Sequence, residues 1–577
     1  MAISRYASWL KSDTDEIFFW HHLPENNVKN AAIIIISPIG PEYMSCHRSI
    51  KLLAEKIALS GIHCIRYDAI GMGNSSGNLE DPGIWDKWID SPQKIRTYLK
   101  NQFNISEIIF IGLRSGCLIL SEAIRTAQIK TAVFWHPQIK GAAYIRSTQL
   151  LDSVLYKKTH ASETTTMEGG GYPVSSELQN NIRDTTLSSE HYRYIENALI
   201  IETKGATKKS KLNEILMSAG IKTELTHLDG LDNMIKQVTL SEIPHSNIEF
   251  IQNWITQLDI PKLANPHNDE DIDSDYSNPE YKESVININA NRKLFGILTT
   301  PNNNEKDLLV IFVNTGAAHH AGPNHIHVDT ARSLIKYGVT TFRIDISNLG
   351  DSANNYEIDP PQEYPLNAAS DINIAIEYIN TLLPHKSIVL CGISAGAHNI
   401  FHAALTSSCE RLRKIILINP ETYYYHSEHT LLSSGNPQPE IDQLYYQKQF
   451  FNYKKWLSLI THPSKLYNIA SFAFIFIIKK VQQLALKMLN SVNIKIRTAL
   501  ENDILLLGDK NIALALIYSE GDPGHQILMS QAARTIKNHR QKNLYASIQI
   551  HNADHTFSSM RSRKDLYEAI AQSVNKT

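Results

Sequence analysis

One stretch of the chain, residues 388–397, constrains the fold more than any other. A short apolar run leads into Gly-x-Ser-x-Gly, and a helical pattern follows. A serine on a sharp strand-to-helix turn needs neighbours without side chains, and Gly392 and Gly396 meet that need. The turn lifts the Ser394 hydroxyl clear of the backbone, and the amide of Ala395 then faces the negative charge that develops on a substrate carbonyl oxygen. The alternative is an ordinary strand-to-helix turn, which the partner residues described below argue against.

The length and composition of the chain limit its class. A chain of 577 residues exceeds what one hydrophobic core holds, so we expect two large domains. The net charge of −2 offers no electrostatic basis for binding nucleic acid. The five cysteines form no Cys-x-x-Cys motif and mostly lie in or beside apolar segments, which predicts free thiols in a reducing compartment, the cytoplasm. The N-terminus has no long apolar stretch, so we expect no signal peptide.

The same order of strand, loop and helix signals occurs twice along the chain. Asp345 follows Asp68 by 277 residues, and Ser394 follows Arg114 by 280 residues, each pair at matching positions. So nearly constant an offset indicates a tandem duplication. Because strands alternate with helices in both halves, we predict an α/β fold with a mostly parallel sheet flanked by helices in each half.

An acidic segment over residues 260–284 separates the two halves. It carries three prolines and shows no apolar period, so we predict an exposed linker. A calcium-binding loop is the alternative, but the segment lacks the glycine and the distal glutamate of such loops. The expected domains are therefore residues 1–259 and 285–577.

The second half contains candidates for the partners of a nucleophilic serine. Hydrolysis by serine needs a histidine base and an acid that orients it, and α/β-hydrolases place them in the order Ser, Asp or Glu, His. After the apolar run at 513–518, Asp522 is the preferred acid, with Glu520 as the alternative. His555 follows the last predicted strand and precedes the last predicted helix, so it is the best placed of the 24 histidines. The plainer interpretation of either residue is an ordinary surface-loop side chain.

The first half has the same plan without this chemistry. Arg114 stands at the position that matches Ser394, on the strand-to-helix turn that we call the elbow. It cannot act as a nucleophile, because its guanidinium stays protonated. Ala206 stands about where the acid belongs, and Asn233 where the base belongs. We therefore predict a non-catalytic copy. Two roles stay open for Arg114: binding an anion such as a carboxylate or phosphate, and forming a structural ion pair.

Short motifs in both halves carry a family resemblance. In the first half they are Gly40-Pro41-Glu42-Tyr43, Arg66-Tyr67-Asp68, Gly112-Leu113-Arg114 and Trp135-His136-Pro137, and in the second half Asn314-Thr315-Gly316, His319 to Asn324, Gly392 to Gly396 and Asp554-His555. The first half resembles the exosortase A system-associated α/β-hydrolases of the second type, in which an arginine recurs at the elbow. The second half is similar to the partner group of serine hydrolases, often labelled serine aminopeptidase-like. The resemblance implies a fusion of two α/β-hydrolases, one of them with a serine mechanism. His325 departs from the arginine usual at its position.

The loop after the first buried strand of the second half supplies the second oxyanion donor in this fold. Here that loop is residues 316–318, and the amide of Ala317 is the candidate by position. Four histidines follow at positions 319, 320, 325 and 327, which raises the alternative of a zinc site. They have no nearby carboxylate at ligand spacing, and adjacent histidines often point apart. We therefore predict neither a metal nor another cofactor.

A long insertion in the second half is expected to form a cap, over about residues 421–508. It holds a helical stretch at 445–456 and the longest apolar run of the chain at 469–478, about half the length that spans a bilayer. An apolar cap favours an acyl or aromatic substrate and excludes water. The alternatives are a membrane-surface helix, which we do not favour, and simple packing on the first half or on the body.

Together these observations predict a tandem α/β-hydrolase. The second domain is expected to cleave a carboxylic ester or thioester of a small-molecule or carrier-bound acyl group, through an acyl-enzyme on Ser394. The first domain would stabilise the second or help to bind substrate. Two alternatives remain: an acyltransferase that uses the same triad of Ser394, Asp522 and His555, and a non-catalytic binding or scaffold protein.

Overall fold

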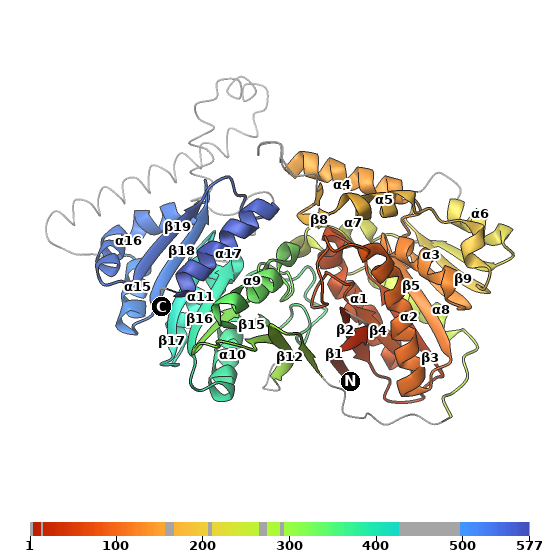
Figure 1. Cartoon of the computed structure of the whole chain (residues 1–577), viewed down its shortest axis with the longest axis horizontal. Coiled ribbons are helices and arrows are strands. Elements are labelled where there is room, and N and C mark those ends of the chain that lie inside the picture. The colour runs from red at the N-terminus through yellow and green to blue at the C-terminus, as the bar shows by residue number, and fades with distance from the viewer. Residues whose placement is uncertain are drawn as a thin grey trace, which may run out of the picture.

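The structure is a computed structural model, and it describes residues 4–12, 15–155, 167–205, 210–264, 274–288, 293–425 and 497–575. These residues form one large sheet in each half of the chain, each flanked by helices, and a small hairpin in the first half (Figure 1). The predicted α/β class is confirmed. In the described part of the chain no helix is both long and apolar enough to cross a lipid bilayer.

The first sheet has eight strands. In their order across the sheet these are β1 (Arg5–Ser12), β2 (Asp15–His22), β4 (His63–Tyr67), β3 (Ala31–Ile36), β5 (Glu107–Leu113), β6 (Thr131–Trp135), β9 (Asn197–Glu202) and β10 (Lys222–His227). β1 and β2 run antiparallel to their neighbours, and the strands from β4 to β10 are parallel. Every residue of β3 is buried, as a central parallel strand covered on both faces requires.

The second sheet repeats this order and adds one strand at its edge. Its strands are β11 (Asp275–Ser277), β12 (Tyr281–Ile288), β13 (Leu294–Pro301), β15 (Thr340–Asp345), β14 (Leu308–Phe312), β16 (Ser387–Ile393), β17 (Leu412–Ile418), β18 (Ala513–Ser519) and β19 (Tyr545–Ile550). The strands from β15 to β19 are parallel. The carboxyl ends of β16 to β19 therefore meet at one edge, where loops from distant parts of the chain converge.

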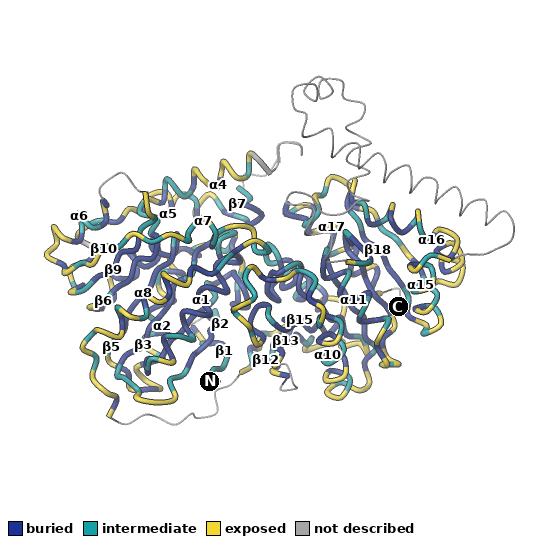
Figure 2. The backbone as a smooth tube through the Cα atoms, turned by 180° about the vertical axis from the view of Figure 1, so that it is seen from behind, coloured by how far each residue is buried: buried dark blue, intermediate teal, exposed yellow. Residues whose placement is uncertain are grey.

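Helices cover both faces of each sheet, and buried positions concentrate on the strands and the inward helix faces (Figure 2). In the first half the longer helices are α1 (Pro41–Leu59), α2 (Ile84–Phe103), α3 (Gly116–Thr126), α4 (Gly141–Leu155), α5 (Ser176–Asp184), α6 (Lys211–Ser218) and α8 (His245–Thr256). In the second half they are α9 (Ile326–Leu334), α10 (Ala368–Leu382), α11 (Ala395–Thr406), α15 (Ala499–Asp509), α16 (Gly524–Gln541) and α17 (Met560–Asn575).

The predicted linker is longer than the segment that separates the sheets. β11 and the start of β12 lie inside residues 275–284, so the second sheet begins within the predicted linker. The reason is aromatic packing between the halves: Tyr276 of β11 stacks on Trp9 of β1, with ring centroids 6.2 Å apart. A single buried tyrosine in a polar stretch leaves no apolar period for sequence analysis to detect.

The last residues of the predicted cap insertion belong to the body of the second half. α15 occupies its last residues, and Leu500, Ile504 and Leu507 belong to the core of the second half. This helix is part of the body. The helical stretch predicted at 445–456 and the apolar run at 469–478 lie outside the described residues.

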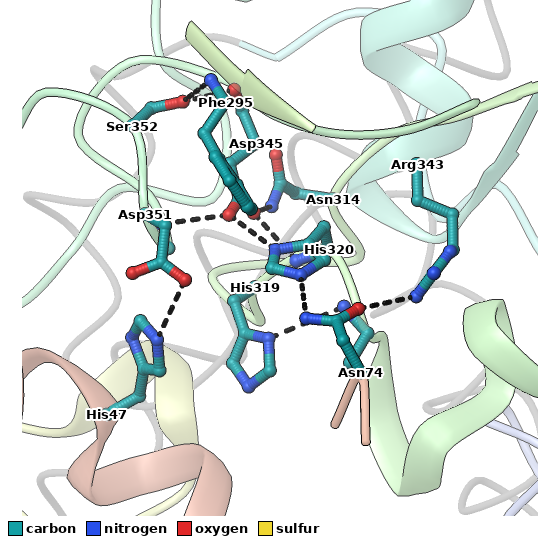
Figure 3. A network of polar contacts seen from close by, with 12 residues as sticks. His47, Asn74, Phe295, Asn314, His319, His320, Arg343, Asp345, Asp351 and Ser352 are labelled. Carbon is teal, nitrogen blue, oxygen red and sulfur yellow. Dashed lines mark hydrogen bonds and ion pairs between the residues drawn. The ribbon is translucent and has the colours of Figure 1, made fainter. Parts of the chain in front are cut away.

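Two matching loops, one with Asn74 in the first half and one with Asp351 in the second half, meet at the contact between the halves (Figure 3). Arg66 of the first half is hydrogen-bonded to the Asp351 carboxylate of the second half. Arg343, which lies 277 residues after Arg66, donates to Asn74 Oδ1 at 3.0 Å, and Asn74 is the counterpart of Asp351 by the same offset. Each arginine thus reaches into the other half's loop, as in the two-fold symmetric interface of a dimer.

The two loops are also shaped alike. The amide of Asn74 donates to Asp68 Oδ2 at 2.7 Å, and the amide of Asp351 donates to Asp345 Oδ2 at 2.8 Å. Lys51 of α1 is fully buried and donates to carbonyl oxygens of the second loop. These contacts make the two halves one packed unit.

Candidate active site

Ser394 lies on the turn between β16 and α11. Its backbone has φ 56° and ψ −120°, a left-handed conformation that a residue with a side chain rarely adopts. A Cβ on Gly392 would lie 2.4 Å from the carbonyl oxygen of Gly396, and a Cβ on Gly396 would lie 2.6 Å from that of Asn314. Both flanking positions therefore require glycine, as the motif predicts.

Asp522 and His555 lie together at the carboxyl edge of the same sheet, after β18 and β19. His555 Nδ1 is 2.8 Å from Asp522 Oδ2. Asp522 is 8% exposed, and its Oδ1 accepts the amide of Gly524 at 3.0 Å, so the carboxylate has a fixed orientation. Glu520, the alternative acid, is an exposed side chain 3.6 Å from His551. The geometry favours Asp522 as the partner of His555.

A buried asparagine holds the histidine loop in place, and sequence analysis did not single it out. Asn419 follows β17 and has φ 44°. Its Nδ2 donates to the carbonyl oxygen of His555 at 2.7 Å, and its Oδ1 accepts the amide of Ser519 at 2.7 Å. One side chain thus ties the loop after β19 to the end of β18.

The free nitrogen of the histidine is the atom that would exchange a proton with the serine. His555 Nε2 is buried and makes no hydrogen bond to the described residues, Ser394 included. Such bonds are often long or poorly aligned before substrate binds. Glu421 Oε1 lies 3.2 Å from Nε2, in an ion-pair contact that is not aligned as a hydrogen bond.

Burial by itself lowers the pKa of His555. The hydrogen bond that His555 Nδ1 donates to Asp522 and the negative charges of Glu421, Asp522 and Asp554 outweigh burial and raise the pKa above its ordinary value. A second carboxylate, that of Glu363, has a raised pKa because it is buried beside Glu421. The histidine therefore sits in a strongly acidic surrounding.

Two amides are the candidates for oxyanion donors. Ala395 is the first residue of α11, where amides have no partner within the helix. The amide of Ala317 has no acceptor among the described residues, although Ala317 is 4% exposed. The Asn314 amide group donates to the carbonyl oxygen of Ala318 at 2.9 Å and so shapes this loop. Both remain the candidates that the sequence predicts.

The first half of the chain touches this site. Thr239 of the first half lies near the Glu363 carboxyl and lowers its pKa, against the larger effect of burial, which raises it. The methyl group of Thr239 lies 3.1 Å from where a Cβ on Gly316 would be, next to the oxyanion candidate Ala317. Val238 packs against the core of the second half. This contact depends on how the halves pack, which no local sequence pattern reveals.

The elbow of the first half carries an ion pair. Arg114 has φ 53°, close to the φ of 56° at Ser394. Its Nη2 lies 3.1 Å and its Nε 3.3 Å from Glu42 Oε1. Of the two roles left open for Arg114, the structural ion pair is the contact present. Asn233 donates to Glu242 at 2.8 Å, and Ala206 lies outside the described residues.

The expectation that no carboxylate lies near the clustered histidines was wrong. His320 Nδ1 is 2.7 Å from Asp345 Oδ2, and Asp351 is close enough for the three to offer ligand atoms within 4.8 Å of one another (Figure 3). β15 lies beside β14, so Asp345 is brought next to the histidine loop. These groups already have protein partners: Asp345 Oδ1 accepts from Asn314 Nδ2, and Asp351 accepts from Arg66. The cluster joins the two halves.

Comparisons with known proteins concern the fold. No protein-family model and no curated protein sequence matches the chain. Among solved structures, Est1E from Butyrivibrio proteoclasticus with bound ferulic acid is 18% identical, with 44% of this chain and 97% of Est1E covered and a TM-score of 0.33. Dienelactone hydrolase from Anabaena variabilis ATCC 29413 is 13% identical over 51% of this chain and 96% of its own, with a TM-score of 0.30. Acylaminoacyl peptidase from Pyrococcus horikoshii is 12% identical over 47% and 43%, with a TM-score of 0.32.

Proposed function

We propose that the second half is a serine hydrolase that cleaves a carboxylic ester or thioester through an acyl-enzyme. The observation that carries the proposal is the 2.8 Å hydrogen bond between His555 and Asp522, at the sheet edge where Ser394 occupies a glycine-flanked turn. Serine, carboxylate and histidine also follow one another in the order of α/β-hydrolases.

The proposed reaction has two steps. Ser394 Oγ attacks the carbonyl carbon while His555 Nε2 takes its proton, and the amides of Ala395 and Ala317 stabilise the oxyanion. The intermediate collapses, and the leaving alcohol or thiol departs with the proton from His555. Water then attacks the acyl-serine, gives a proton to His555 and releases the acid, and the proton returns to Ser394.

The first half has a supporting role in this proposal. Arg114 and Asn233 replace a nucleophile and a base, while Thr239 lies beside Gly316 and near Glu363. A tandem duplication, and the resemblance to exosortase A system-associated hydrolases, explain the shared strand order. A cytoplasmic location and an acyl substrate, either small or carrier-bound, complete the proposal.

The test is turnover of p-nitrophenyl esters from acetate to decanoate by the full chain and by Ser394→Ala. We expect hydrolysis by the wild type only, and labelling of Ser394 by a fluorophosphonate probe. Wild-type turnover that Ser394→Ala retains would contradict the proposal. So would a folded wild-type chain that neither hydrolyses these esters nor reacts with the probe.

A further inference from the structure

His555 lies between two carboxylates, and the proposed mechanism uses only one. Asp522 is 2.8 Å from Nδ1, and Glu421 is 3.2 Å from Nε2. Nε2 is the atom that must be free of a proton to activate Ser394. A negative charge at this nitrogen favours its protonated form and therefore opposes the first step of the reaction. The proposed mechanism gives Glu421 no role at this position.

The position of Glu421 is determined by its surroundings. It lies two residues after Asn419, which is hydrogen-bonded to the loops after β18 and β19. Its other oxygen is 3.5 Å from the hydroxyl of Tyr364. The Tyr364 ring stacks on Tyr425 with centroids 4.5 Å apart. The contact with His555 is thus built from anchored groups on two sides.

Among the described residues, the charged groups that act most on the imidazole have the same sign. Glu421, Asp522, Asp554 and the partly buried Glu363 face His555, and each negative charge favours the protonated ring. Glu421 is the one that acts directly at Nε2. Asp522 must stay, because it orients the ring, so Glu421 is the carboxylate whose removal tests the effect.

We propose that Glu421 is a positioning residue that holds the proton on His555 Nε2 in the resting site and so sets the pH above which Ser394 is activated. The inference rests on the proposed serine mechanism. It adds that Glu421 competes with Ser394 for the same nitrogen. Because Glu421 favours the protonated ring, activation of Ser394 decreases at low pH. Neutralising Glu421 releases this hold.

The experiment is the rate of fluorophosphonate labelling of Ser394 in the full chain as a function of pH. Wild type is compared with Glu421→Gln, Glu421→Asp and a control, Glu520→Gln, whose exposed carboxylate pairs with His551. Labelling needs neutral His555, so its rate falls as pH drops. We expect Glu421→Gln to move the midpoint of this fall about one unit lower, because one carboxylate near the ring is lost. Glu421→Asp should shift it less, and Glu520→Gln not at all.

The outcomes separate the two proposals. A wild-type midpoint that Glu421→Gln leaves unchanged, with labelling intact, would overturn the role of Glu421 and leave the serine mechanism standing. The same shift in Glu520→Gln would also overturn it, because the effect would then be one of general charge. Wild type that shows no labelling at any pH from about 5 to about 9 would overturn the serine mechanism, and this inference with it. The Glu421→Asp variant keeps the charge and decides the matter if the Gln variant fails to fold.

Discussion

The turns at Arg114 and Ser394 have similar backbone φ angles and carry side chains of different chemistry. Arg114 and Ser394 have φ values of 53° and 56°. A Cβ on Gly116 would lie 2.4 Å from the carbonyl oxygen of Ile36, much as Gly396 approaches the loop opposite it. A strained turn is often taken as a mark of catalysis, yet the first half keeps the turn without a nucleophile. The close approach of strand, loop and helix maintains the turn. The side chain at its apex, Arg114 or Ser394, determines the chemistry available there.

The surroundings of the elbows differ in the same way. In the first half, His136 follows β6 and binds Asn247 Oδ1 at 3.0 Å. Burial lowers the pKa of His136 to about 4, so this histidine stays neutral. In the second half the histidine lies on the last loop, with carboxylates on both sides. Similar folds thus hold one histidine whose pKa is lowered by burial and another whose pKa is raised by neighbouring carboxylates.

The largest expected difference between the halves lies in the base. His555→Ala should lower kcat/KM for p-nitrophenyl esters by about 10⁴-fold, the scale on which triad residues act. Asn233→Ala, at the matching position, should leave kcat/KM unchanged because its amide only contacts Glu242. Steady-state kinetics on both variants decide the comparison. A similar loss in Asn233→Ala would mean that both halves take part in the chemistry.

The next comparison concerns the loops where the halves meet. Asp351→Ala leaves the buried Arg66 without its carboxylate partner, which we expect to cost about 3 to 5 kcal/mol of unfolding free energy. Asn74→Ala removes the matching contact of Arg343, but Arg343 keeps its ion pair with Glu283 at 2.9 Å. That loss should be about 1 to 2 kcal/mol. Urea unfolding measures the loss of unfolding free energy in both variants. Equal losses would show that the charge of Asp351 does not make its contact stronger than that of Asn74.

The sequence predicts what local pattern determines. The buried strands, the elbow and the order of Ser394, Asp522 and His555 follow from motif and periodicity, because parallel strands bring the loops after β16, β18 and β19 to one edge. The roles of Asn419 and Glu421 were missed, since single polar residues after a strand look like ordinary turn residues. β11 was missed because its burial depends on Trp9 of the other half. Contacts between the halves depend on three-dimensional packing, which the spacing of residues in the sequence does not reveal.

A smaller effect is expected where the first half touches the site of the second. Thr239→Ala removes a hydroxyl near the Glu363 carboxyl and a methyl group beside Gly316. We expect kcat/KM to fall about three- to tenfold, as the loss of about 1 kcal/mol predicts. Thr256→Ala, on an exposed part of α8, is the matched control and should have no effect. Equal activity in all three proteins would mean that the first half supports the site only through folding.

The smallest effect is expected at the elbow of the first half itself. Arg114 and Glu42 are each about one-fifth exposed, and a pair of this kind contributes about 1 kcal/mol or less. Arg114→Gln should therefore change unfolding free energy little and leave turnover intact, and Glu42→Gln should behave in the same way. A double-mutant cycle in urea tests whether the two side chains act only on each other. If Arg114→Gln instead raises KM for an anionic ester while Glu42→Gln lowers it, then freeing the guanidinium improves binding, and the first elbow is an anion site that Glu42 holds closed.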